Sequence, residues 1–401
     1  MAERGPVASW ATDFDVMDPA YIEDPFSIWD DLRETCPIAH TERRRGAWLL
    51  TTYDDVTAVA HDTTTFSSTQ IMVIRPDEAP QGAGPGFLPY GIPPISADPP
   101  LHTWTRRLLL PWFSHRRVAS LEPMTRALCN RLIDGFIDQG RVDAAEGYAQ
   151  QIPVRVIATT LGVPDSLADT FTGWVRDVLE FADDQLKRIE GRRGILGYLT
   201  EEIARRRQDP KDDLISSLLA EEHDGAPLDD RLILGICALV LVAGIDTTWS
   251  AIGSTLWHLA THPEDTARLV AEPALMASAV EEFLRAYSPV TMARVVTTDT
   301  TYAGCPMAAG DKVLMNFPAA NRDPKVFDRA NEVVLDRAHN RHVAFGSGIH
   351  RCAGSNLARM ELTVAVEAWL ARIPQFRLEH GADVTWAGGQ VRGPRTLPVV
   401  F

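Results

Sequence analysis

Apolar residues recur three and four positions apart along most of this 401-residue chain, the spacing that places them on one face of a helix. The periodicity predicts helices over residues 120–139, 142–162, 166–190, 192–207, 229–260 and 273–287. Within the fifth of these, the run from Leu232 to Ile245 carries no charge. About 14 uncharged residues are too few for a membrane span, so this run is predicted to form a buried central helix.

Stretches with strand character are few and short. They cover residues 46–52, 294–302, 312–317, 383–387 and 395–400. The first precedes a helix, the next two flank Gly304 and Gly310, and the last two are predicted to pair as a hairpin. The chain is therefore predicted to be mainly α with small β-sheets.

The sequence contains no Ser/Gly-rich linker, internal repeat or low-complexity stretch. Its Gly/Pro-rich segment, residues 79–86, is short and flanked by apolar residues, which is typical of a loop within a domain. We therefore expect residues 1–401 to form one domain. Whether that domain works alone or as an excised part of a longer protein stays open at this point.

Charge and cysteine usage disfavour several classes of function. The net charge of −15 disfavours nonspecific binding to nucleic acid or anionic membranes. The five cysteines form no CxxC pair, and their odd number argues against a disulfide framework. The N-terminal residues lack the basic-then-apolar pattern of a signal peptide. We expect a cytoplasmic protein with neither a membrane nor a nucleic acid as partner.

The most specific motif surrounds Cys352, in the stretch FGSGIHRCAG from Phe345 to Gly354. Glycines such as Gly346 permit positive φ angles that turn backbone amides inward. A helix is predicted to begin after Gly354, and its first N–H groups would favour a thiolate. The ordinary alternative is a buried structural cysteine beside a glycine turn.

A second motif, Ala243-Gly244-Ile245-Asp246-Thr247-Thr248, interrupts the most apolar helix with poor helix formers. Gly244 would let a planar cofactor or a diatomic ligand approach the backbone. Thr247 offers a hydroxyl to bound oxygen, and Asp246 can relay protons from solvent. The ordinary alternative is a helix with a polar kink.

Two charged pairs complete the set of motifs. Glu282 and Arg285 are three residues apart on a predicted helix, where such a pair is usually a surface salt bridge worth under about 1 kcal/mol. His102 and Arg106 are four residues apart, so they share one helical face and can grip a carboxylate together. Either pair alone is most often a surface feature.

In their order along the chain, these motifs resemble those of the bacterial cytochrome P-450 monooxygenases, from about residue 20 to Phe401. Phe345, Gly348, Cys352 and Gly354 match the haem-binding signature of that family. The resemblance implies the cytochrome P-450 fold, with haem sandwiched between a long central helix and a proximal cysteine loop. It makes Glu282 and Arg285 a structural pair. The cofactor-binding residues that it implies are His102, Arg106, Ala243, Gly244, Arg294, Phe345, Gly346, His350, Cys352 and Gly354.

The resemblance also implies a chemistry. Cys352 would be the metal ligand of a b-type haem, and its thiolate would favour cleavage of the O–O bond of dioxygen. Asp246 and Thr247 would be catalytic, delivering protons while one oxygen atom enters the substrate by hydroxylation or oxidative dealkylation.

The electrons would come from NAD(P)H through a separate ferredoxin or flavodoxin with its reductase, because the sequence has no GxGxxG after a strand and no cysteine cluster. Basic groups at 106–107, 116–117 and 341–342 could attract an acidic partner.

Two other functions share the thiolate. A peroxide-driven peroxygenase would not need an Asp–Thr proton relay, and a non-catalytic haem sensor would need neither the relay nor an organic ligand. Family position predicts an apolar pocket for a small or mid-sized organic substrate, although such apolar stripes are as often plain core. The pocket residues so predicted are Ile71, Met72, Val73, Phe87, Leu88, Leu239, Val290, Met292 and Val391.

Overall fold

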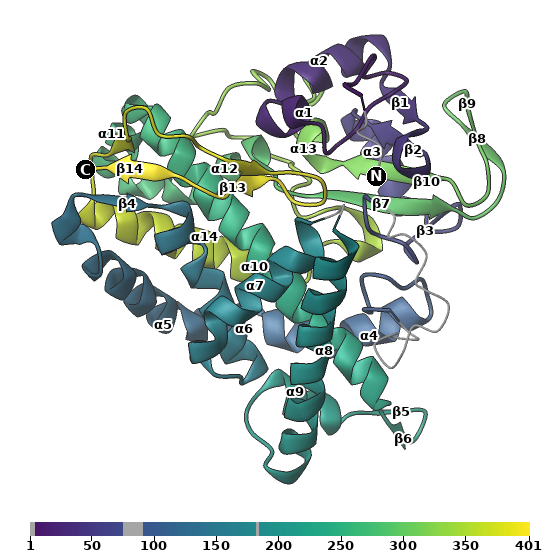
Figure 1. The fold of residues 1–401 in the computed structure, drawn as a ribbon, viewed down its shortest axis with the longest axis horizontal. Coiled ribbons are helices and arrows are strands. Elements are labelled where there is room, and N and C mark those ends of the chain that lie inside the picture. The colour runs from purple at the N-terminus through teal and green to yellow at the C-terminus, as the bar shows by residue number, and fades with distance from the viewer. Residues whose placement is uncertain (1–4, 75–90, 182–183) are drawn as a thin grey trace.

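The structure, a computed structural model, describes residues 5–74, 91–181 and 184–401 (Figure 1). The predicted pocket residues Phe87 and Leu88 lie outside the described residues. The helices are α1 (Pro19–Glu23), α2 (Phe26–Thr35), α3 (Tyr53–His61), α4 (Leu101–Leu109), α5 (His115–Asp134), α6 (Gln151–Leu161), α7 (Ala168–Leu179), α8 (Gln185–Gln208), α9 (Leu214–Leu219), α10 (Asp230–Thr261), α11 (Pro263–Ala271), α12 (Met276–Ala286), α13 (Phe317–Ala320) and α14 (Ser355–Arg372).

The strands are β1 (Ile38–Thr41), β2 (Ala47–Leu50), β3 (Phe66–Ser67), β4 (Arg141–Asp143), β5 (Glu222–His223), β6 (Ala226–Pro227), β7 (Thr291–Val296), β8 (Thr300–Tyr302), β9 (Cys305–Met307), β10 (Lys312–Asn316), β11 (Arg377–Leu378), β12 (Trp386–Ala387), β13 (Gly393–Pro394) and β14 (Pro398–Val400). The main sheet has five strands in the order β1-β2-β10-β7-β3. Within it β2 and β10 run parallel, whereas the other neighbours are antiparallel. In Figure 1 this sheet lies to one side, beside α1 to α3, while helices fill the rest of the molecule.

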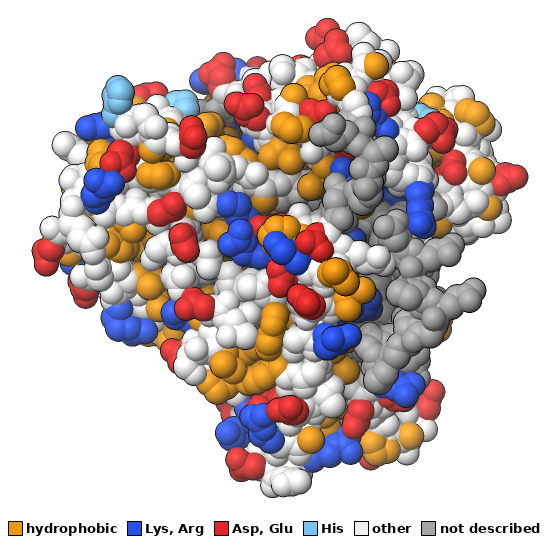
Figure 2. Space-filling view, viewed as in Figure 1, with side chains coloured by type: hydrophobic (Ala, Val, Ile, Leu, Met, Phe, Trp, Pro, Cys, Tyr) orange, Lys and Arg blue, Asp and Glu red, His pale blue; other side chains and the backbone are white. Residues whose placement is uncertain are grey.

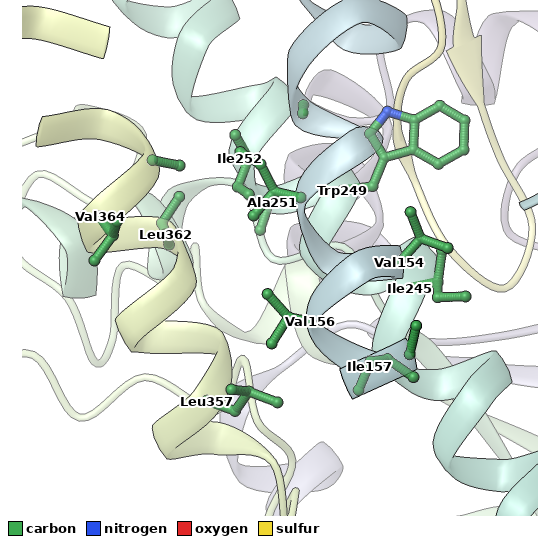
Figure 3. Packing of buried hydrophobic residues seen from close by; sticks show 14 of the residues in the cluster. Val154, Val156, Ile157, Ile245, Trp249, Ala251, Ile252, Leu357, Leu362 and Val364 are labelled. Atoms are coloured by element: carbon green, nitrogen blue, oxygen red, sulfur yellow. The ribbon is translucent and has the colours of Figure 1, made fainter. Parts of the chain in front are cut away.

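Helix α10 runs through the centre of the molecule (Figure 1). Its first turn is capped by the side chain of Asp229, which accepts a hydrogen bond from the Arg231 N–H. Ile245 and Ile252 of α10 belong to one large core with residues of α6 and α14, and Figure 3 shows these three helices contributing side chains to it. The prediction of a buried helix over 229–260 is confirmed.

Two predicted helix boundaries were wrong. The break predicted between 190 and 192 lies instead between α7 and α8, before Gln185. Asp184 determines that start, because its carboxylate accepts from the Lys187 N–H and caps the first turn of α8. The segment 142–162 is not one helix either. It holds the end of β4, a π-helical turn over Ala145–Ala149 and α6.

The predicted C-terminal hairpin was wrong in its pairing. Strand β12 pairs with β13, at 393–394, and not with 395–400. Strand β14 instead lies between β11 and β4 in a separate three-stranded sheet. The strand predicted over 294–302 is likewise two strands, β7 and β8, because the chain turns at 297–299 to begin a second small hairpin.

Helix α10 is long and apolar enough to cross a membrane, but 72% of its most apolar stretch is buried inside the protein, as expected for a core helix. On the face shown in Figure 2, acidic and basic side chains are interspersed, with hydrophobic side chains between them.

Candidate active site

The cysteine loop is closed by its own backbone. The Cys352 N–H donates to the Phe345 carbonyl at 2.8 Å. Gly346 and Gly348 both adopt positive φ, at 71° and 69°, as the sequence predicts. A Cβ on Gly348 would lie 2.4 Å from the carbonyl oxygen of Ala60. The loop therefore excludes any larger residue there, both by its backbone angle and by its contact with α3.

The thiol of Cys352 is exposed, yet it lies so deep that burial raises its pKa. The Gly354 N–H and the charges of Arg106 and Arg351 act in the opposite direction, as predicted for a helix start, but burial outweighs them. A metal cation beside the sulfur would oppose the effect of burial, because metals deprotonate coordinating thiols outright.

The basic residues predicted to hold a carboxylate group come together beside this loop. His102 of α4 and His350 of the loop have ring centroids 4.3 Å apart, and Arg106 donates to the Arg351 carbonyl at 2.5 Å. Arg294 of β7 is close enough that its charge lowers the pKa of His350. Four residues from three distant parts of the sequence thus form one cluster of cations and imidazoles.

The cluster is short of negative charge within the described chain. Burial lowers the pKa of Arg294 to about 10, and Asp98 is the one acid found to oppose that shift. Asp98 already accepts from the Ser67 hydroxyl and the Ser68 N–H. Both ring nitrogens of the buried His102 lack a partner at hydrogen-bonding geometry, although the Ile349 backbone lies near enough to affect its pKa. Buried donors without partners fit the carboxylates of a bound group.

The polar motif of α10 presents one face that is not packed. Ala243 is exposed and Thr247 half-buried within a helix that is otherwise largely buried. The two are four residues apart and share a face. The Thr247 hydroxyl donates to the Ala243 carbonyl at 2.8 Å, the back-bonding that favours a bend in a helix. The hydroxyl oxygen retains its acceptor capacity on that open face.

Gly244 has a different role from the one predicted. A Cβ there would lie 2.4 Å from Cδ1 of Ile157, so the glycine permits the close approach of α10 to α6. It does not open the backbone to a cofactor. The prediction that its missing side chain makes room for a cofactor was therefore wrong, because the glycine lies on the face of α10 that packs against α6.

Asp246 is buried, at 2% exposed, and paired with a residue that the sequence did not indicate. Its Oδ1 accepts from Nη2 of Arg395 at 2.6 Å, while its Oδ2 has no partner among the described residues. Arg395 also pairs with Glu180 at the end of α7, and Glu180 pairs with Arg176 at 3.1 Å. Burial raises the pKa of Asp246 to about 6 although the positive charge of Arg395 opposes the shift.

Glu282 and Arg285 form a fully buried pair and not a surface bridge. Both side chains are 0% exposed, and two parallel bonds of 2.8 Å join the guanidinium to the carboxylate. Arg337 adds a third bond to Glu282 at 2.8 Å, and Asn340 a fourth. Arg285 in turn donates to the carbonyls of 321, 330 and 332. The pair therefore joins α12 to the long segment that precedes the cysteine loop.

Comparison with known proteins identifies the family. The family model described as cytochrome P-450 matches residues 165–384. The mycinamicin IV hydroxylase/epoxidase of Micromonospora griseorubida is 36% identical over 93% of this chain and 94% of its own length. The vitamin D(3) 25-hydroxylase of Pseudonocardia autotrophica is 35% identical over 96% of both chains. The chain belongs to the cytochrome P-450 family.

The fold agrees with this identification. The crystal structure of CYP109E1 from Bacillus megaterium, in complex with testosterone, superimposes with a TM-score of 0.85 at 29% identity, over 94% of this chain and 97% of that one. As a cytochrome P-450, the chain is a monooxygenase and an oxidoreductase. A b-type haem supplies the chemistry of dioxygen reduction, with electrons derived from NAD(P)H.

The residues of this P-450 fit a haem. The His102 ring, which has no hydrogen-bond partner among the described residues, and the cations beside it suit its two propionates, and one accessible thiol suits its iron. Among the described residues, no three His, Cys, Asp or Glu side chains gather to hold a metal ion by themselves. That is expected where a porphyrin supplies the other ligands and Cys352 adds a single sulfur.

The predicted pocket residues do not all face one space. Val73 belongs to a core cluster with Phe14 and Tyr21, so its prediction as a substrate contact was wrong. Leu239 is 8% exposed and lies in the main core. Met72, Val290 and Met292 are half-buried, whereas Ile71 and Val391 are at most 7% exposed. The structure nonetheless brings 71–73, 290–292 and 391 together, with a β-bridge between 290 and 391.

A small cavity lies where these segments meet the helices α7 and α8. Among the predicted pocket residues, Met72 lines this cavity. Gln390, a polar residue that the sequence did not single out, lines it as well. Gln390 could not be recognised from its neighbours, because its partners lie about 100 and 320 residues away. The lining residues are Met17, Met72, Ile74, Val178, Leu179, Arg188, Gly389 and Gln390.

Proposed function

We propose that this P-450 oxidises a mid-sized apolar organic substrate at a C–H bond, with Cys352 as the haem ligand and Asp246 and Thr247 as the proton-delivering pair. The observation that carries the proposal is that a cysteine and one face of a largely buried helix are both accessible. An accessible thiol lies in the loop before α14, and the exposed Ala243 and half-buried Thr247 lie on α10. The basic cluster beside the loop supplies donors for the propionates.

In this arrangement each protein group has a defined task. Asp246 Oδ2 is buried and unpartnered, and a pKa of about 6 allows it to gain and lose a proton near neutrality. The Thr247 hydroxyl lies one residue along the helix and can accept a hydrogen bond on the open face while its own hydrogen is donated to the Ala243 carbonyl. Arg395 and Glu180 extend the polar chain from Asp246 towards α7.

The substrate class rests on the pocket and on the relatives. Met72, Val290 and Met292 are apolar and partly accessible. The relatives named above are a hydroxylase/epoxidase of mycinamicin IV and a hydroxylase of vitamin D(3). A macrolide- or sterol-sized neutral molecule is the class that we propose, without a choice between the two.

We further propose that a ferredoxin, or a flavodoxin, delivers electrons at the face outside the cysteine loop. The side chains of Arg107, Arg116, Arg341 and Arg351 are all exposed there, and Ile349 is 39% exposed among them. An acidic partner would be attracted although the chain itself is acidic. We propose the cytoplasm as the site of action, and residues 1–401 as one haem domain.

The test begins with the ferrous–CO spectrum of the purified holoprotein, which should show a band near ~450 nm for an axial thiolate. Cys352→Ser should abolish this band, while the matched variant Cys305→Ser should keep it. A band that survives Cys352→Ser would disprove the assignment of the ligand. NADPH with a surrogate ferredoxin and its reductase should then support product formation from a macrolide or a sterol. Turnover confined to hydrogen peroxide would instead show a peroxygenase.

A further inference from the structure

The segment Ile71–Val73 is held in place by two buried side chains from distant parts of the sequence. Gln390, 8% exposed, accepts from the Val73 N–H at 2.8 Å and reaches the Ile71 carbonyl at 3.4 Å. Lys312, 2% exposed, donates to the carbonyls of Met72 and Val73 at 2.6 and 3.2 Å. Together they satisfy four backbone groups of three consecutive residues.

The amide of Gln390 extends the backbone pairing that begins between Ile71 and Ala293 of β7. In an extended segment, the carbonyl of one residue and the N–H two residues later point to the same side, where a paired strand would meet them. Gln390 places an amide N–H and an amide C=O opposite those two groups. The Ile71 carbonyl also accepts from the Ala293 N–H of β7 at 3.0 Å, so Gln390 supplies the partner of the Val73 N–H and adds a second donor to the Ile71 carbonyl.

The same amide also binds the second wall of the predicted pocket. Its Nε2 donates to the Thr291 carbonyl at 2.9 Å and contacts the Met292 sulfur at 2.8 Å. The backbone carbonyl of Gln390 accepts from the Thr291 N–H at 3.1 Å. Gln390 therefore connects three segments, 71–73, 290–292 and its own turn, which lie more than 90 residues apart in sequence.

We propose that Gln390 is a positioning residue that sets the shape of the substrate pocket and, through it, selectivity among large ligands. It does so by holding Met72 and Met292 at a fixed separation beside the cavity that Val178 and Arg188 also line. The inference rests on the proposed function, since it assigns the pocket of that same haem site. An apolar residue at this position would leave the Val73 N–H and the Ile71 and Thr291 carbonyls without their side-chain partner.

Gln390→Met tests the proposal because methionine has a similar length and no amide. Gln150→Met is the matched control, since Gln150 is also buried, at 9% exposed, but belongs to none of the three segments. Gln390→Asn serves as a milder variant that keeps the amide but is one methylene too short to span the gap. All variants are compared as haem-loaded protein with the same ~450 nm CO band.

The first readout needs no turnover. Amide hydrogen exchange of the peptide that contains Val73 should be at least about tenfold faster in Gln390→Met than in the wild type, because a buried hydrogen bond is lost. Gln150→Met should leave this exchange unchanged. Unchanged protection of Val73 in both Gln390 variants would overturn the proposal.

The second readout compares a bulky azole, clotrimazole, with imidazole by their Soret shifts. Both bind the haem iron, but only clotrimazole depends on the pocket walls, so its Kd should rise at least about tenfold in Gln390→Met while that of imidazole stays constant. The proposal would be overturned if the Kd values of both azoles rose equally, or if neither rose. A wild-type protein without the CO band would contradict the proposed function, whereas the exchange result would still report on Gln390.

Discussion

Arg395 Nη2 donates to Asp246 Oδ1 at 2.6 Å, and both side chains are buried, so the acid of the motif at 243–248 is held by a residue six positions before Phe401. The contact is possible because the hairpin β12–β13 packs against α10. A Cβ on Gly393 would lie 2.3 Å from Cβ of Ser250. Burial raises the pKa of Asp246, and the charge on Arg395 partly offsets this rise.

Arg395→Met should therefore slow proton delivery and change its pH dependence. Without the guanidinium, the pKa of Asp246 rises further above about 6, because the opposing positive charge is gone. In ferredoxin-supported turnover, we expect the acidic limb of the kcat profile to move to higher pH by about one unit or more. Arg141→Met is the control, because Arg141 is exposed, pairs with Glu379 and is not among the groups that shift the pKa of Asp246. An acidic limb that stays at its wild-type pH would show that Arg395 does not tune Asp246.

The same buried acid should make stability depend on pH. Its folded-state pKa of about 6 lies above the ordinary aspartate value of 3.8, so the folded protein binds the proton more tightly than the unfolded chain. The resulting stabilisation is complete below about pH 4 and is lost as the pH rises through about 6, and it amounts to about 3 kcal/mol. Guanidinium unfolding of Asp246→Asn should show a flatter pH dependence over this window than the wild type. The exposed Asp209→Asn should follow the wild type, and parallel curves for all three would contradict the assignment.

The fold was predictable where local signals and burial agree. Helix α10 was predicted to within one residue at each end, because its apolar run is long and Asp229 is a strong cap. The break before α8 was missed because apolar periodicity continues across it, whereas the signal that decides it is the Asp184 cap. The hairpin of β12 was mispaired because β14 also has strand character, and only the tertiary structure shows that β14 pairs with β4.

The site was predictable where chemistry follows a motif, and not where it depends on contacts distant in sequence. Cys352, the basic cluster and the buried pair of Glu282 and Arg285 could be recognised from spacing and order. Arg395 and Gln390 could not, because nothing near them in the sequence marks a partner on α10 or at 71–73. Val73 was assigned to the pocket because an apolar residue looks alike on either face of a segment.

Glu282→Gln should destabilise the protein strongly. The substitution removes the charge that Arg285 and Arg337 share in the interior, and a buried cation that loses its partner costs about 3–5 kcal/mol. Hydrogen bonds from these two arginines also lower the pKa of Glu282 although burial by itself would raise it. We expect a large fall in Tm and little haem-loaded protein.

Glu332→Gln is the matched control for this loss. Glu332 pairs with Arg329 at the same three-residue spacing, but both side chains are more than half exposed. Differential scanning calorimetry should show no measurable change in Tm for it. Similar Tm values for Glu282→Gln and the wild type would mean that the buried pair does not hold the segment before the cysteine loop.

Arg294 allows haem binding to be separated from folding. Its guanidinium is 4% exposed and donates to the Ala293 carbonyl, with burial lowering its pKa to about 10. A buried cation without a carboxylate is costly, so Arg294→Met should leave the haem-free chain at least as stable as the wild type in urea. The haem-bound protein should lose a charge-assisted hydrogen bond worth about 1.5–3 kcal/mol, which corresponds to about ten- to hundredfold faster transfer of haem to apomyoglobin. Arg107→Met removes a charge that is exposed on α4 and should change neither property. If Arg294→Met instead destabilises the haem-free chain and leaves haem transfer at the wild-type rate, Arg294 stabilises the sheet and not the cofactor.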